Sequence, residues 1–293
     1  MGDETGVYLH AGAHRTGTSS FQACLAANAG VLGAAGYDLA YPGRDGIPTG
    51  TLALRLPHPR HGRKSFDGFR TGAVAELARH VTGPGRALVV SEENVPGRMF
   101  HFYQGQFFPA ARRRARILKE ALPGPLRHLL YVVRPYDALY VSAFRKRSED
   151  NPTPPFAEVR ERMMQIDTGW PELLEVFAEE LQPDRMTVIE YGARGSSTDL
   201  LRRLLPDTPE VEEPEAQLNL SATDAALMAL QARYHAGETL ERAAWQAVIA
   251  DHAADRTPRD FAAFTEAQRQ TLGAAYARDL DRIAAMPGLT FIR

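Results

Sequence analysis

The sequence predicts an α/β fold, in which a three-layer α/β/α arrangement surrounds a central parallel sheet of about five strands and is followed by C-terminal helices. Short apolar runs of largely unbroken hydrophobicity are typical of strands that are covered on both faces. Helical patterns between these runs indicate strand–helix alternation. The predicted strands are Val7–Ala11, Tyr37–Tyr41, Ala87–Ser91, His128–Val133 and Met186–Tyr191.

The segments between the strands carry helical patterns and one long irregular stretch. The predicted helices are Ser20–Ala35, Thr71–Val81, Phe108–Leu122, Asp137–Ser148 and Trp170–Leu181. Pro42–Phe69 is rich in Gly, Pro, His and Arg, and a stretch of this kind in a compact domain indicates either a binding loop or a disordered segment. The basic run Arg112–Arg116 is expected to form a solvated helix face. Trp170 and Trp245 are expected in the core.

We expect residues 1–293 to form a single domain. Residues 1–205 hold the predicted α/β core, and residues 206–293 form a mainly helical C-terminal extension. Helical patterns run from Ser221 to Met286, and Ser221 with Asp224 has the spacing of a capping pair at the start.

Composition excludes several classes of protein. A length of 293 residues with 44% hydrophobic residues suits one large α/β domain. The formal net charge is −2, so no global basic field favours nucleic-acid binding. Cys24 is the single cysteine, which excludes an intrachain disulfide. No apolar run approaches the roughly 20 residues that span a bilayer, and we expect a cytoplasmic protein with no membrane span.

The segment from Val7 to Ser20 has the pattern of an anion-binding loop. An apolar strand leads into a loop bounded by Gly12 and Gly17, and a helix is predicted to start near Thr18. Amide groups at a helix N-terminus converge on one point, where the helix dipole favours negative charge. The glycine spacing fits the G-x-x-x-x-G of a P-loop, but Thr18 stands where a nucleotide-hydrolysing P-loop has Lys. The cation lies earlier, at Arg15.

A second candidate anion site follows the fourth predicted strand. Arg134 ends this strand, and Pro135 and Asp137 open a helix that carries Ser142. An arginine at the ligand-binding edge of the sheet can contact a phosphate with two nitrogens. Ser142 adds a hydroxyl if the helix runs along the same phosphate.

Together the two motifs resemble those of the sulfotransferase family, whose fold is similar to that of P-loop NTPases. The stretch His-x-Gly-x-His-Arg-Thr-Gly-Thr-Ser-Ser from His10 to Ser20 is similar to the family's 5′-phosphosulfate loop, and Arg134-Pro135-x-Asp137-x-x-x-x-Ser142 is similar to its 3′-phosphate motif. The family transfers a sulfuryl group from 3′-phosphoadenosine 5′-phosphosulfate (PAPS) to a hydroxyl or amine. The resemblance covers roughly residues 7 to 205.

The resemblance implies a role for each matching residue. Arg15 matches the loop cation that contacts the phosphosulfate, although the family more often has Lys there. Thr16, Gly17, Thr18 and Ser19 match the part of the loop that binds the 5′-phosphate, and Arg134 and Ser142 match the pair that binds the 3′-phosphate. The family's C-terminal Arg-Lys-Gly cofactor loop has only Arg194-Gly195 as a weak counterpart.

Sulfuryl transfer also needs a base for the acceptor proton. Glu92 and Glu93 follow the third predicted strand, so their side chains can face the anion loop. A carboxylate can serve as base if burial raises its pKa from about 4.3 toward neutrality. We place Glu93 first and Glu92 second, with His14 and His10 as rivals that flank the loop. The scheme requires no metal, and the histidine spacings indicate none.

Two other functions remain open on the sequence alone. One is a P-loop kinase or NTPase, and the other is a non-catalytic nucleotide-binding module on the same fold. The residues at the strand ends, Ser-Glu-Glu and Arg-Pro, count against the first because it needs a strand-end Asp for magnesium. The acceptor is expected to be a small molecule, glycan or lipid.

Overall fold

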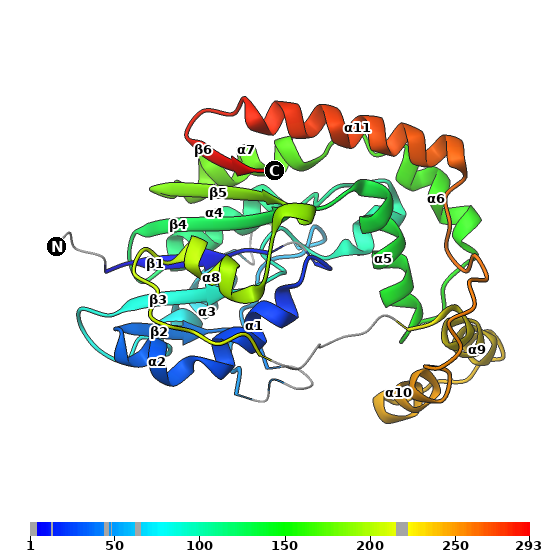
Figure 1. The fold of residues 1–293 in the computed structure, drawn as a ribbon, viewed down its shortest axis with the longest axis horizontal. Helices are drawn as coiled ribbons and strands as arrows, with labels where there is room; N and C mark the ends of the chain where they lie inside the picture. The colour runs from blue at the N-terminus through cyan, green and yellow to red at the C-terminus, as the bar shows by residue number, and fades with distance from the viewer. Residues whose placement is uncertain (1–4, 13, 44–46, 48, 62–65, 215–221) are drawn as a thin grey trace.

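The computed structural model describes residues 5–12, 14–43, 47, 49–61, 66–214 and 222–293, and Figure 1 shows their arrangement. Within them, six strands form one sheet in the order β2-β3-β1-β4-β5-β6, and all bonded pairs are parallel. The strands are β1 (Val7–His10), β2 (Tyr37–Ala40), β3 (Ala87–Ser91), β4 (Leu126–Val133), β5 (Arg185–Glu190) and β6 (Leu289–Ile292). The α/β fold and its parallel sheet are therefore as predicted.

Helices cover both faces of this sheet (Figure 1). The described helices are α1 (Thr18–Ala27), α2 (Ala29–Ala34), α3 (Phe66–Ala78), η2 (Met99–Gln104), α4 (Ala111–Ala121), α5 (Tyr136–Ser148), α6 (Phe156–Met164), α7 (Trp170–Leu181), η3 (Tyr191–Ala193), α8 (Ser197–Leu204), α9 (Asp224–His235), α10 (Arg242–Asp251) and α11 (Glu266–Ala284), where η marks a 3₁₀-helix. Among the described residues, no helix is both long enough and apolar enough to cross a membrane.

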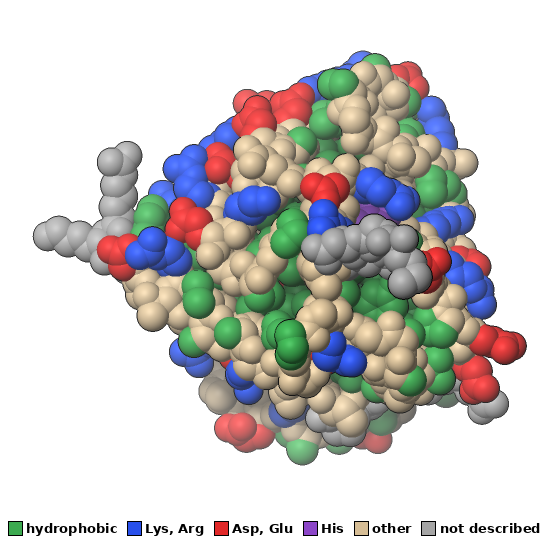
Figure 2. Space-filling view, turned by 90° about the vertical axis from the view of Figure 1, so that its left-hand side faces the viewer, with side chains coloured by type: hydrophobic (Ala, Val, Ile, Leu, Met, Phe, Trp, Pro, Cys, Tyr) green, Lys and Arg blue, Asp and Glu red, His purple; other side chains and the backbone are tan. Residues whose placement is uncertain are grey.

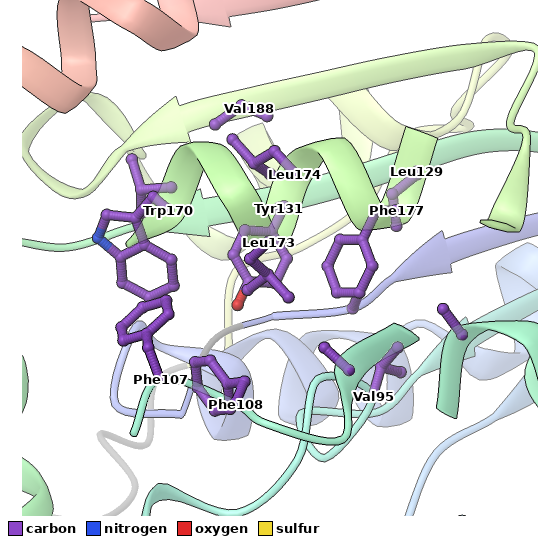
Figure 3. Close-up of a cluster of buried hydrophobic side chains, with 14 of the residues drawn as sticks. Val95, Phe107, Phe108, Leu129, Tyr131, Trp170, Leu173, Leu174, Phe177 and Val188 are labelled. Carbon is purple, nitrogen blue, oxygen red and sulfur yellow. The ribbon is translucent and has the colours of Figure 1, made fainter. Parts of the chain in front are cut away.

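Two hydrophobic clusters lie on opposite faces of the sheet because successive strand residues point to opposite sides. In β4, Tyr131 belongs to the cluster beneath α3, α4 and α7, whereas Leu130 and Val132 belong to the cluster beneath α1 and α8. Figure 3 shows the first cluster, in which Trp170 and Phe177 of α7 lie beside Tyr131. Continuous apolar strands are needed to fill both clusters.

The C-terminal segment adds the sixth strand, which the prediction of about five strands missed. β6 has only four residues and pairs with β5 at the edge of the sheet. It is only partly buried, so its apolar signal is weak. Helix α11 precedes it and contacts α5 and α7. Ser221 of the predicted capping pair lies outside the described residues, and Thr223 caps α9 by accepting a hydrogen bond from the Ala226 amide.

Several helix predictions need correction. The predicted helix Ser20–Ala35 is two helices that meet at Asn28, whose side-chain amide donates to the carbonyls of Cys24 and Glu212, both at 2.8 Å. A contact with such a distant residue has no local signal. The predicted loop 42–69 ends earlier, because α3 begins at Phe66. Trp170 is fully buried as expected, but Trp245 is only half-buried, on a helix without buried residues.

Candidate active site

A cavity of about 1010 Å³ lies at the carboxyl ends of the central strands. Its walls come from the segments that follow β1, β3, β4 and β5, which is where ligands bind in open α/β sheets. Most of the predicted site residues line it: His14, Arg15, Gly17, Thr18, Ser19, Glu93, Arg134 and Ser142. Thr16 and Glu92 do not line it. On the side of the molecule that faces left in Figure 1, basic and acidic side chains are interspersed on the surface (Figure 2).

The loop after β1 is held in a conformation that needs glycine at both ends. Gly12 and Gly17 have positive φ angles of 24° and 95°. A Cβ atom at Gly12 would lie 2.6 Å from the Thr18 hydroxyl oxygen, and one at Gly17 would overlap the guanidinium of Arg194. The loop can therefore close tightly over the start of α1, where Thr18 is the first helical residue. Gly17, Thr18 and Ser19 line the cavity, and the amide groups at a helix start favour an anion.

The two sequence motifs, more than a hundred residues apart in the chain, meet in this cavity. Arg15 has a left-handed backbone (φ 65°), and its Nε donates a 2.8 Å hydrogen bond to the hydroxyl of Ser142 on α5. Arg134 donates from Nη1 to the backbone carbonyl of Arg15 at 2.5 Å. Thr16 is buried, and its carbonyl accepts a 3.4 Å hydrogen bond from Arg194. The loop is thus anchored to the ends of two neighbouring strands.

Arg134 forms no ion pair with a carboxylate among the described residues. Its Nε is buried and has no hydrogen-bond partner among the described residues. Its guanidinium lies 4.9 Å from the centre of the Tyr191 ring. Burial lowers the pKa of Arg134 from its usual value. The Trp170 indole fixes the end of the strand by donating to the Arg134 carbonyl at 2.9 Å. A negatively charged ligand here would satisfy the open donor and favour the charged form.

The two candidate carboxylates have different surroundings. Glu93 lines the cavity, and its Oε1 lies 3.2 Å from Nδ1 of His14. Glu92 is buried, and its Oε1 accepts hydrogen bonds from the backbone amide and the side chain of Asn94, at 2.7 and 2.8 Å. Burial raises the pKa of Glu92. Glu92 therefore stabilises the turn after β3 through its hydrogen bonds from Asn94, whereas Glu93 faces the cavity.

The two rival histidines also differ. His14 Nε2 is buried without a hydrogen-bond partner among the described residues, while Nδ1 faces Glu93. His10 lies inside the sheet, where its ring packs on Phe21 and its Nδ1 lies 3.0 Å from the Ser91 hydroxyl. Burial lowers the pKa of His10 to about 3, so the ring is neutral at pH 7. Only His14 of the two lines the cavity.

Several lining residues were not singled out from the sequence as site residues. Arg194, the weak counterpart of the family's C-terminal loop, stacks on Tyr191 at 5.0 Å and reaches the loop after β1. Arg98, Lys146 and Arg147 also line the cavity. Lys146 and Arg147 lie four and five residues after Ser142 on α5, a spacing that could have pointed to them. Arg98 offers no comparable signal, because its segment has no motif.

Comparison with known proteins gives one structural similarity. No protein-family model matches the chain, and no curated protein matches it in sequence. The chain is similar to a crystal structure of a sulfotransferase from Alicyclobacillus acidocaldarius, with 13% identity and a TM-score of 0.43. The similarity covers 96% of this chain and 95% of that one. An identity this low does not transfer a function, so the functional proposal rests on the residues of the cavity.

Proposed function

We propose that this protein is a sulfotransferase that transfers a sulfuryl group from PAPS to a hydroxyl or amine. The observation that carries the proposal is the meeting of Arg15, Arg134 and Ser142 at one cavity beside the N-terminus of α1. The cavity volume of about 1010 Å³ lies at the upper end of the range for small-molecule sites, which leaves room for a nucleotide and an acceptor.

The residues present fit a nucleotide with two separate phosphate groups. The amides at Gly17 to Ser19 would hold the 5′ end, since they lie at a helix start. Arg134 has an open buried donor and would hold the 3′-phosphate together with Ser142. Ser142 only accepts from Arg15 Nε, so its hydroxyl could still donate to the 3′-phosphate while the Nη groups of Arg15 contact the phosphosulfate.

When bound, PAPS supplies the sulfuryl group, and a bond from sulfur to the acceptor forms as the bond from sulfur to the 5′-phosphate oxygen breaks. Arg15 and the helix-start amides would stabilise the negative charge that develops on the leaving phosphate. The acceptor proton would pass to the pair of Glu93 and His14, with Glu93 as the first choice of base. If His14 Nε2 receives the proton instead, Glu93 would orient the ring through Nδ1.

Ligand binding tests the nucleotide class. Adenosine 3′,5′-bisphosphate at a hundred times its dissociation constant should add about 2.7 kcal/mol to the free energy of unfolding. Thermal unfolding with the bisphosphate, and separately with Mg-ATP, measures this. Stabilisation by Mg-ATP without stabilisation by the bisphosphate would favour a P-loop kinase or NTPase and contradict the proposal. Binding of the bisphosphate without any turnover of PAPS would indicate that the protein is a non-catalytic nucleotide-binding module.

A pair of isosteric substitutions tests the base. Glu93→Gln should lower kcat about 100- to 10,000-fold while leaving bisphosphate affinity unchanged, because only proton transfer is lost. Glu92→Gln is the matched control, since a glutamine oxygen can still accept both hydrogen bonds from Asn94. Turnover is measured with sulfur-labelled PAPS. Full activity of Glu93→Gln with a large loss in His14→Gln would assign the base to His14.

A further inference from the structure

The cavity has two sides, and on one of them the proposed function uses only the base, Glu93. In the sheet, β3 flanks β1 on one side and β4 on the other, with β5 next to β4. Arg134, the proposed anchor of the 3′-phosphate, follows β4, and Arg194, which also lines the cavity, follows β5. The β3 side holds Glu93 and the segment 98–103, which includes η2. Since Glu93 is the proposed base, the acceptor must approach from this β3 side.

Helix α5 forms the wall between the two sides. Ser142 and Lys146 are four residues apart and share a helix face, while Ala143 and Arg147 share the neighbouring face, and Asp150 lies two residues beyond the helix end at Ser148. The second face packs on η2: the Tyr103 hydroxyl donates to the Ala143 carbonyl at 2.9 Å, and the Arg147 guanidinium lies 5.2 Å from the centre of the Phe100 ring. Arg147 therefore belongs to the acceptor side, together with Arg98 at the start of η2.

The cations that α5 and the start of η2 contribute to the cavity differ in whether they form ion pairs with carboxylates. Lys146 forms a 2.5 Å ion pair with Glu149. Arg98 is exposed, and neither Arg98 nor Arg147 forms an ion pair with a carboxylate in the described part of the chain. Two carboxylates also line this side. Glu93 lies against His14, and Asp150 accepts a hydrogen bond from the Asn151 side chain, so both have polar contacts of their own.

We propose that the acceptor is an anion: besides the hydroxyl or amine that receives the sulfuryl group, it carries a carboxylate, phosphate or sulfate group that Arg98 and Arg147 bind. A guanidinium group can donate two parallel hydrogen bonds to two oxygens of a carboxylate, phosphate or sulfate group. The ring of Phe100 holds Arg147 at the cavity wall without neutralising its charge. This inference rests on the proposed sulfotransferase function, because it assigns the second substrate of the same site.

The acceptor's charge can be tested before the acceptor is identified. Extract from the producing cells is separated on an anion-exchange column, and each fraction is incubated with the enzyme and sulfur-labelled PAPS. Label should enter compounds of the retained, anionic fractions. Label confined to the unretained fraction would overturn the inference and leave the transferase function standing. If no fraction accepts label although adenosine bisphosphate binds, the transfer reaction itself is wrong, and this inference fails with it.

Variants then connect the charge to the two arginines. With the active retained fraction as acceptor, Arg98→Gln and Arg147→Gln should each lower kcat/KM about 10- to 100-fold, the effect of losing one charge-assisted hydrogen bond. Bisphosphate affinity should not change. Arg278→Gln is the control, because Arg278 is exposed on α11 outside the cavity lining. Unchanged kcat/KM in both variants would overturn the inference. Loss of activity after phosphatase treatment of the fraction would identify a phosphate ester; no loss would indicate a carboxylate or sulfate.

Discussion

Two regions of this molecule are rich in arginine, and they differ in whether these arginines form ion pairs with carboxylates. On α4, Arg112 and Arg116 form ion pairs with Glu179 or Glu180 of α7. In the cavity, Arg134 and Arg147 form no ion pair with a described carboxylate, and their guanidinium groups lie over aromatic rings instead. An aromatic ring holds a cation in place without cancelling its charge. The charge of these cavity arginines is therefore available to a ligand, whereas the arginines of α4 form ion pairs within the protein.

The density of arginine in the sequence did not distinguish the two regions. The run from Arg112 to Arg116 is the denser one, and its prediction as a solvated face is wrong for Arg114. That side chain is buried, and burial lowers its pKa to about 10. It donates to the carbonyls of Leu56, Pro57, Asn94 and Val95. What distinguishes a binding arginine is an unmet donor in a cavity, and this depends on tertiary structure.

Arg134 is expected to have the largest effect on nucleotide binding, and this effect distinguishes the cavity arginines from those of α4. Arg134→Ala should weaken binding of adenosine 3′,5′-bisphosphate by about 30- to 1,000-fold, or about 2–4 kcal/mol, because a buried charge–charge contact is lost. Calorimetric titration measures the affinity. Arg112→Ala serves as the control from α4 and should bind as the wild type does. Equal affinity in all three proteins would mean that the cavity arginine has no role in nucleotide binding.

The next effect concerns stability rather than binding. Arg114→Met keeps the length and apolar stem of the side chain but removes donors to four carbonyls, so it should lower the free energy of unfolding by about 2–4 kcal/mol. Urea unfolding measures this. Arg113→Met on the same helix loses one hydrogen bond, to the His61 carbonyl, and should cost less. Equal losses would show that burial of Arg114 does not matter.

The parts of the fold that could be predicted are those with a local cause. Five strands have continuous apolar runs because both of their faces are buried, and α7 has the predicted bounds Trp170–Leu181. The short edge strand β6 lacks such a run, and the break at Asn28 depends on a carbonyl of Glu212. Local pattern therefore predicts the central elements, and distant contacts decide the boundaries.

The candidate site follows the same division. Arg15, Arg134 and Ser142 could be proposed because each stands in a motif with glycine or proline at a fixed spacing. Arg98 could not, since its segment has no motif and its place near Arg147 depends on the packing of η2 against α5, whereas Arg147 had only its spacing from Ser142 as a signal. Glu93 is placed before Glu92 on the sequence alone, and the structure adds that Glu93 lines the cavity whereas Glu92 is buried outside its lining.

The smallest expected effect is the pH dependence of the stability that the ion pairs of Glu180 with α4 contribute. Hydrogen bonds from Arg116 and then Arg112 hold the pKa of Glu180 below its usual value. A carboxylate with a lowered folded-state pKa stabilises the fold above its unfolded pKa, and this stability is lost as pH falls through the folded pKa. Arg112→Gln should therefore cost about 0.2–1 kcal/mol at pH 7, as for other exposed pairs, and less as pH falls below about 4.5.

Arg147→Gln provides the contrast, because Arg147 has no ion pair with a described carboxylate. Its effect on the free energy of unfolding should be the same at pH 7 and at pH 4. Urea unfolding of both variants at the two pH values makes the measurement. If the Arg147 variant shows the pH dependence expected of the Arg112 variant, then Arg147 forms an ion pair with a carboxylate. Its charge would then not be available to bind a ligand in the cavity.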